Sequence, residues 1–178
     1  MADHYSANIT IGGALTPAAL ADLIDAVTAD AAGVDYGCAI TSAAEAEAAA
    51  RDAISEQRCL DLCDDSASWG RFDAIEACAT QHGLPFRRTC EAKYEYDGEV
   101  VYFDGTALHN EDANQSGDPI VTLDALKEAH SKGTVADLIA RLSVVDSPIP
   151  PLTPPPIVSQ LVPLKWARLP ATGVDPAV

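Results

Sequence analysis

The first part of the chain switches from a strand-like to a helix-like spacing of apolar residues. Residues 5–11 alternate between apolar and polar positions and end before Gly12-Gly13, which is typical of a strand followed by a turn. Thr16 then precedes Pro17, a pair suited to the N-cap and the first position of a helix. Apolar residues follow at intervals of three and four, so the pattern predicts a helix that Gly33 ends.

The next segment predicts a short strand and a second helix. Residues 34–40 suit a short strand, and Ser42 is placed to cap the segment that follows. That segment is rich in Ala and Glu to about Gln57, which favours a helix with a weak apolar face.

A third pair of elements comes after Gln57. Residues 59–63 suit a short strand, and residues 64–66 are expected to form a loop or a cap. A helical pattern starts at Arg71 or Phe72 and runs to Gln81, where Gly83 ends it. Trp69 and Phe72 are interpreted as residues that pack at the entry to this helix.

A β-hairpin is predicted around Asp97-Gly98. This dipeptide separates residues 87–96 from residues 99–103, and Asp-Gly between two β-rich runs is typical of a two-residue type I′ turn. Such a turn would pair Tyr96 with Glu99, Tyr94 with Val101 and Ala92 with Phe103. Alternation then places Val101 and Phe103 on the core face. The other face, which is expected to be more exposed to solvent and acidic, holds Val100 and Tyr102 together with Glu91, Glu95 and Asp104.

The last third predicts two helices and a proline-rich tail. Residues 105–119 are expected to be a loop, Thr122 caps a short helix to His130, and a second helix starts at Thr134. Nine of the twelve prolines lie in residues 146–178, which excludes a regular helix or a central strand there. The tail also holds apolar residues, so we expect it to pack on its own domain or on a partner through Ile157, Leu161, Leu164 and Trp166.

The element order predicts an α+β fold with a single compact domain over residues 1–145 and a Pro-rich extended tail over residues 146–178. The sheet is expected to be mixed or antiparallel, with three to five strands and with helices packed on one side. Hydrophobic residues make up 48% of the chain, which is enough for a folded core.

The charge of the chain is strongly negative and unevenly distributed. The net charge is −16, and residues 1–120 carry 22 acidic against 6 basic side chains, whereas residues 121–178 carry 5 of each. This balance argues against a protein that binds nucleic acid directly. Either the charge serves solubility, or it forms an electronegative surface that attracts a basic partner.

Candidate catalytic and metal-binding motifs are weak. The five cysteines are odd in number and lack the paired spacing of a zinc site, so we expect no metal, no cofactor and a reduced, cytoplasmic location. We find no apolar segment long enough to span a membrane and no export signal at the start of the sequence. A small enzyme is an alternative, with an active site that no sequence motif marks; its residues would lie near Cys63, Asp64, Asp65 and His82.

The sequence favours a non-enzymatic binding or inhibitor protein. In its broad character it resembles phage inhibitors and DNA-mimic proteins, which implies a basic, nucleic-acid-binding protein as partner and an anti-defence role on a phage or plasmid. A structural or assembly protein that docks through its apolar tail is the other alternative. The carboxylates expected to contact the partner lie on the predicted second strand, the hairpin and their flanking loops; they are Asp61, Asp64, Asp65, Glu91, Glu95, Asp97, Glu99 and Asp104.

Overall fold

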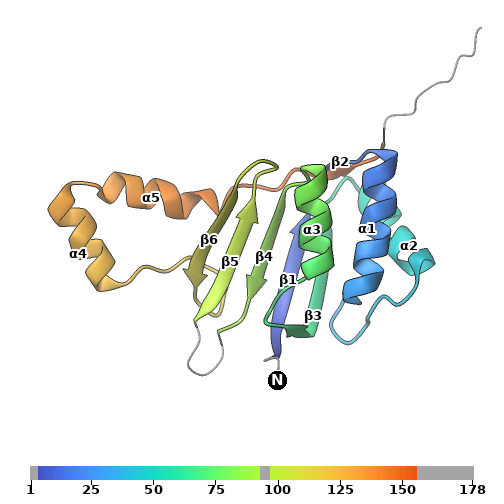
Figure 1. Ribbon diagram of the computed structural model, residues 1–178, viewed down its shortest axis with the longest axis horizontal. Coiled ribbons are helices and arrows are strands. Elements are labelled where there is room, and N and C mark those ends of the chain that lie inside the picture. The colour runs from blue at the N-terminus through green and yellow to red at the C-terminus, as the bar shows by residue number, and fades with distance from the viewer. Residues whose placement is uncertain (1–3, 93–96, 156–178) are drawn as a thin grey trace, which may run out of the picture.

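The computed structural model describes residues 4–92 and 97–155, which form an α+β domain around a five-stranded antiparallel sheet (Figure 1). The strand order is β3-β1-β4-β5-β6. The strands span β1 (His4–Ile11), β3 (Leu60–Ser68), β4 (Phe86–Cys90), β5 (Gly98–Phe103) and β6 (Leu108–Ala113). The predicted fold class is therefore confirmed, and the sheet is antiparallel throughout these five strands.

Two helices, α1 (Pro17–Asp30) and α3 (Asp73–His82), lie against one face of the sheet, and α2 (Ala43–Ser55) packs beside α1 (Figure 1). The remaining two, α4 (Leu123–Lys132) and α5 (Val135–Val144), form a hairpin beyond β6.

The predicted N-terminal caps of α1 and α2 are confirmed, but α1 ends at Asp30 with a left-handed Ala31 as its C-cap, and the predicted stop residue Gly33 instead pairs with Cys63 of β3. Thr16 Oγ1 accepts a hydrogen bond from Ala19 N, and Ser42 and Glu45 form a reciprocal capping box.

The core lies between the sheet and α1 and α3. Ile9, Ile11 and Phe86 are buried on the sheet, and Phe86 lies 5.7 Å from Phe103 between ring centroids. From the helices, Leu23 and Ile75 complete the same cluster. Each fully buried side chain of this size contributes roughly 1.5–3 kcal/mol to folding, so this layer fixes α1 and α3 against the strands.

The hairpin prediction is wrong in its register. Glu99 pairs with Cys90, Val101 with Arg88 and Phe103 with Phe86, which is six residues away from the predicted pairing. β4 ends at Cys90, and Gly98 lies in β5 with an ideal Cβ only 2.8 Å from the carbonyl oxygen of Cys90. The glycine therefore allows close approach of a neighbouring backbone and does not form a turn.

The prediction that one face of the hairpin is exposed to solvent is also wrong, because β5 is buried on both sides. Val100 and Tyr102 form a second apolar cluster with Ala113 and Val145. Ala113 comes from β6 and Val145 follows α5, so segments distant in sequence cover the face that alternation assigned to solvent.

Three local predictions differ from the structure. Residues 34–40 form a loop with an isolated bridge between Gly33 and Ala39 in place of a strand. Residues 64–66 continue β3 to Ser68, and the predicted loop over residues 105–119 contains β6. The second half of β3 and the whole of β6 were missed because their sequences are polar, and each is held by hydrogen bonds to a more apolar neighbouring strand.

The described part of the tail, residues 146–155, lies against the domain. β7 (Leu152–Thr153) pairs in parallel with β2 (Gly13–Ala14), and the Leu152 side chain is buried. The backbone N–H of Leu152 also donates to the carbonyl oxygen of Arg58. The predicted burial of Ile157, Leu161, Leu164 and Trp166 lies outside the described residues and stays a prediction.

Substitution of Gly12 by alanine is expected to loosen the packing of residues 146–155 against the domain. An ideal Cβ on Gly12 would lie 1.8 Å from the carbonyl oxygen of Pro150, so residues 146–155 must shift to admit it. We expect Gly12→Ala to lower the free energy of unfolding by about 1–3 kcal/mol and to speed proteolysis within residues 146–155. Ala14→Ser, at an exposed position of β2, is the control in urea denaturation, and equal stability of the two variants would contradict the close approach.

Candidate binding surface at one end of the sheet

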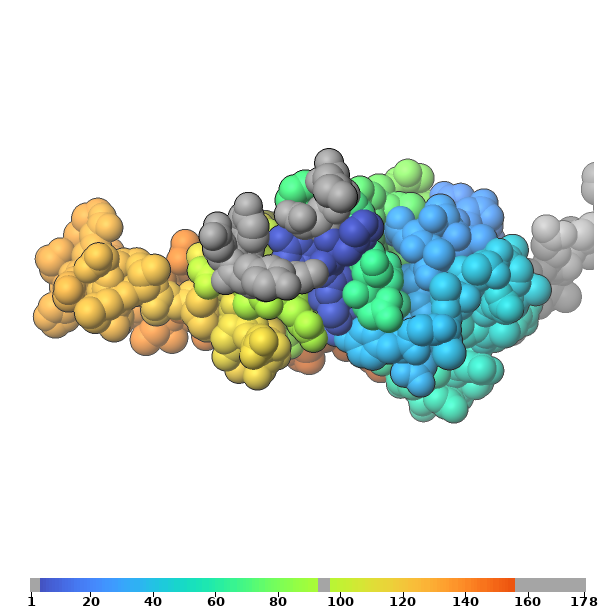
Figure 2. All heavy atoms as spheres, turned by 90° about the horizontal axis from the view of Figure 1, so that it is seen from below, coloured from blue at the N-terminus to red at the C-terminus, as the bar shows by residue number. Residues whose placement is uncertain are grey.

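Strand direction brings several acidic residues to one end of the molecule. β1 and β5 begin at this end, whereas β3, β4 and β6 finish there. Figure 2 looks onto this end. We call it the acidic end, and its exposed or half-exposed carboxylates on or next to the strands are those of Asp64, Asp65, Glu91, Asp97 and Asp112.

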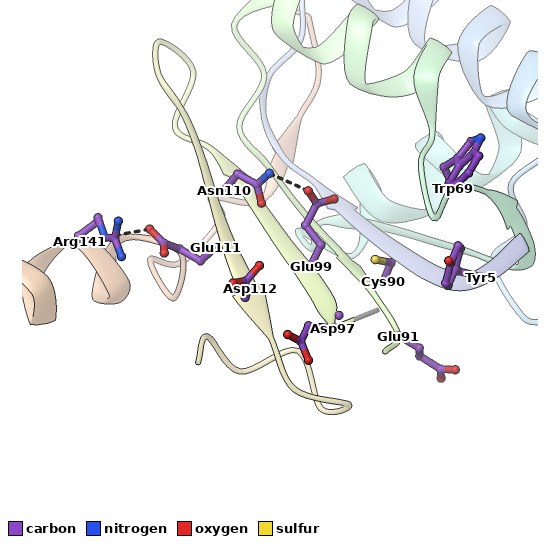
Figure 3. A pocket seen from close by; sticks show the side chains of 11 residues that line it. Tyr5, Trp69, Cys90, Glu91, Asp97, Glu99, Asn110, Glu111, Asp112 and Arg141 are labelled. Atoms are coloured by element: carbon purple, nitrogen blue, oxygen red, sulfur yellow. Dashed lines mark hydrogen bonds and ion pairs between the residues drawn. The ribbon is translucent and has the colours of Figure 1, made fainter. Parts of the chain in front are cut away.

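An open pocket of about 520 Å³ lies at the acidic end (Figure 3). Two aromatic residues, Tyr5 and Trp69, line one side of it, and β6 and Arg141 of α5 line the other. Five carboxylates at or near the ends of β4, β5 and β6 also line the pocket; they are Glu91, Asp97, Glu99, Glu111 and Asp112.

Trp69 is held outward by the tight turn after β3. Its φ is +55°, and Gly70 follows with a φ of +65°. A Cβ on Gly70 would lie 2.6 Å from the Cβ of Cys90, so the turn fits closely against β4. Trp69 is 52% exposed, whereas Phe72 is buried, so the packing role predicted for both residues is correct only for Phe72.

A buried arginine lies beneath the pocket. Arg88 is 2% exposed, and its Nη1 donates to the carbonyl oxygen of Gly70 at 2.8 Å while its Nη2 donates to Glu99. The Arg88 Nε lies 2.8 Å from Glu76 Oε1, which also accepts from Phe72 N. This network ties α3, β4 and β5 together.

The two carboxylates of this network differ in their pKa. Burial raises the pKa of Glu76 above its usual value in spite of the neighbouring Arg88. Burial also opposes ionisation of Glu99, but hydrogen bonds from Arg88 and from Asn110 Nδ2, at 2.6 Å, outweigh it and lower the pKa. Glu99 is therefore ionised and already occupied by internal donors.

The acidic region extends beyond the strands to the helix ends. Asp30, at the end of α1, accepts hydrogen bonds from Ala74 N and Ile75 N at the start of α3. Burial raises the pKa of Asp30, and the nearby Asp73 and Asp64 raise it further.

The predicted partner-binding residues divide into separate groups. Glu91 and Asp97 are exposed at the pocket, and Asp64 and Asp65 lie on β3 at the same end. Asp61 accepts from Thr10 Oγ1 at 2.7 Å on the sheet face opposite the helices. Glu95 lies outside the described residues.

Asp104 is separated from Asp97 by the length of β5, about 20 Å for six residues. Its Oδ1 accepts hydrogen bonds from Thr106 N and Ala107 N, both at 2.7 Å. These hydrogen bonds lower the pKa of Asp104 to about 2. The carboxylate therefore organises the turn before β6, and Glu91 and Asp104 do not share one acidic face.

Sequence reasoning missed Glu111 and Asp112 because it missed β6. The segment Leu-His-Asn-Glu-Asp-Ala gives no apolar strand signal, and its residues reach the pocket only through pairing with β5. Glu111 also contacts Arg141 at 3.2 Å, which links the pocket to α5.

The alternative enzyme site is not assembled. His82 ends α3 and contacts Asp22 at 2.7 Å, whereas Cys63, Asp64 and Asp65 lie on β3 near the start of that helix. Burial raises the pKa of the Cys63 thiol, and the carboxylate of Asp35 raises it further, which disfavours a nucleophilic thiolate.

The other cysteines provide no metal centre in the described residues. Cys78 is buried, and burial with the nearby Asp22 raises its pKa to about 11. Within residues 4–92 and 97–155, no cluster of three or more His, Cys, Asp or Glu side chains is arranged to hold a metal ion. Over the same ranges, none of the helices has the length and apolar character needed to cross a bilayer.

Comparison of the chain with protein-family models, with curated proteins and with solved structures finds no match in any of the three.

Proposed function

We propose that this protein is a non-enzymatic binding protein that engages a basic partner, a nucleic-acid-binding protein, through its acidic end. The observation that carries the proposal is the convergence of exposed carboxylates from several strands around an open pocket. Glu91, Asp97 and Asp112 make no salt bridge to any basic side chain within the described residues.

The electrostatics of the acidic end support a charged partner more than a small substrate. Arg88, beneath the pocket, is already paired with Glu76 and Glu99. Arg141, which lines the pocket, is paired with Glu111. Exposed carboxylates on ordered strands then present an uncompensated negative field, which steers a basic surface and speeds its association. A protein that mimics DNA in this way would act as an inhibitor, which suits an anti-defence role.

The test compares two matched double charge reversals. Asp97→Lys/Asp112→Lys changes the acidic end, and Asp25→Lys/Asp52→Lys makes the same change in net charge at exposed positions of α1 and α2. The basic protein captured from the source cell by the wild type is immobilised, and association is followed by surface plasmon resonance at low and high salt.

We expect the reversal at the acidic end to slow association at least about tenfold at low salt, because oriented charges act mainly on the on-rate. The control reversal should slow it much less, and high salt should reduce the difference. DNA should compete with the wild type for the partner. Capture of no basic protein, equal slowing by both variants or a salt-independent rate would each refute the proposal.

A further inference from the structure

The α4–α5 hairpin exposes apolar side chains to an unusual degree. Leu123 is 65% exposed, Leu126 41% and Ile139 59%, and α5 has no fully buried residue. The hairpin projects from the domain beyond β6, so α1, α2 and α3 do not cover it (Figures 1 and 2).

These apolar residues share one side of the hairpin. Leu123, Leu126 and Val135 line a shallow groove of about 360 Å³ with Lys127 and His130 at its rim. Ile139 lies one helical turn after Val135 on the same side of α5. Two helices of ten residues each are marginal in water unless such a face is packed, so the groove is suited to an occupant.

Charge selects the kind of occupant. Residues 123–144 carry three acidic and three basic side chains, in contrast to the excess of acidic residues in the rest of the domain. Within α4, Lys127 pairs with Asp124 at 3.3 Å and Lys132 with Glu128 at 2.5 Å. Two copies of a chain with a net charge of −16 repel each other, and this neutral, apolar surface is where that repulsion is smallest.

We propose that the α4–α5 hairpin is a homodimerisation surface, at which the hairpins of two copies pack face to face around a twofold axis. A twofold contact uses the same patch on both copies, and two antiparallel helix pairs bury their apolar faces as a four-helix bundle. Arg141, which lines the pocket at the acidic end, lies two residues after Ile139 and so on the opposite side of α5, which leaves that pocket free on both copies.

The experiment measures the mass of the full chain by sedimentation velocity from about 1 to 100 µM. The wild type is expected to be a dimer in the upper part of this range. Leu123→Glu/Ile139→Glu places a charge at two exposed positions and should raise the dissociation constant at least about a hundredfold, leaving a monomer with an unchanged circular dichroism spectrum. Val34→Glu/Leu108→Glu makes the same change at residues that are 58% and 61% exposed elsewhere, and it should remain dimeric.

Two further variants test whether the acidic end or the C-terminal tail forms the dimer contact. Asp97→Lys/Asp112→Lys should stay dimeric, so failure of the proposed function and failure of this proposal are distinguishable. Leu161→Glu/Trp166→Glu tests the tail as the occupant of the groove and should also stay dimeric. A monomeric wild type at 100 µM, a dimer that survives Leu123→Glu/Ile139→Glu, or loss of the dimer in the tail variant would each overturn the proposal.

Discussion

Replacing Arg88 with alanine is expected to lower the free energy of unfolding by about 3–5 kcal/mol. The guanidinium is 2% exposed and is the common partner of Glu76, Glu99 and the carbonyl oxygen of Gly70. Its removal leaves two carboxylates in a poorly solvated space between α3 and the sheet, and the cost of that unpaired charge exceeds the net stabilisation from the original contacts. Guanidinium denaturation of both proteins at pH 7 measures the difference.

The loss of unfolding free energy caused by Arg88→Ala is expected to become smaller as the pH falls towards 5. Burial already raises the pKa of Glu76 in the folded protein, and loss of Arg88 raises it further. A carboxyl whose folded-state pKa is raised destabilises the protein above that pKa, and protonation at lower pH relieves the penalty. A deficit that grows on acidification would contradict this account.

Two variants serve as controls for Arg88→Ala. Arg51→Ala removes an exposed arginine that pairs with Glu47 on α2 and should change stability by less than about 1 kcal/mol. The triple variant Arg88→Met/Glu76→Gln/Glu99→Gln removes all three charges and should recover most of the loss. If Arg88→Ala lowers the free energy of unfolding no more than Arg51→Ala does, the network of Arg88 does not hold α3 on the sheet.

Local signals in the sequence were sufficient to predict the helices. Thr16 before Pro17, Ser42 with Glu45, and Thr122 each satisfy backbone donors of the turn that follows, and Gly133 ends α4 with a left-handed φ. These interactions involve residues three to five positions apart, so the sequence contains both partners of each contact within one short window.

The sheet and the acidic pocket depend on contacts between distant segments. The local sequence Arg87-Arg88 does not indicate a buried side chain, yet pairing of β4 with β1 and β5 places Arg88 in the interior beside Glu76 and Glu99. Asp112 reaches the pocket only because β6 pairs with β5. The sequence therefore predicted an acidic surface. Which carboxylates lie together on it depends on how the strands pair, and that pairing cannot be read from local sequence.

Gly98 shows how a local signal can fit a different physical cause. Asp-Gly suits a type I′ turn because both residues of that turn need a positive φ. In the structure Gly98 is a strand residue without a left-handed φ, and an ideal Cβ on it would lie 2.8 Å from the Cys90 carbonyl oxygen and 3.0 Å from that of Ala113. The missing side chain lets the strand ends on both sides approach β5.

Gly98→Ala is therefore expected to lower the free energy of unfolding by at least about 2 kcal/mol, because backbone atoms on both sides must move and ladder hydrogen bonds are strained. Gly37→Ala is the control: Gly37 has a φ of +74°, and a Cβ there meets no atom within 4 Å, so only backbone strain of about 1 kcal/mol is expected. If Gly98 instead formed a turn, the two substitutions would lower the free energy of unfolding by similar, small amounts. Urea denaturation of both variants distinguishes these cases, and a Gly98→Ala protein no less stable than Gly37→Ala would contradict the register of β4 and β5. Because Gly98 also lines the acidic pocket, the same variant should disturb the spacing of Asp97 and Asp112 and slow association with the basic partner.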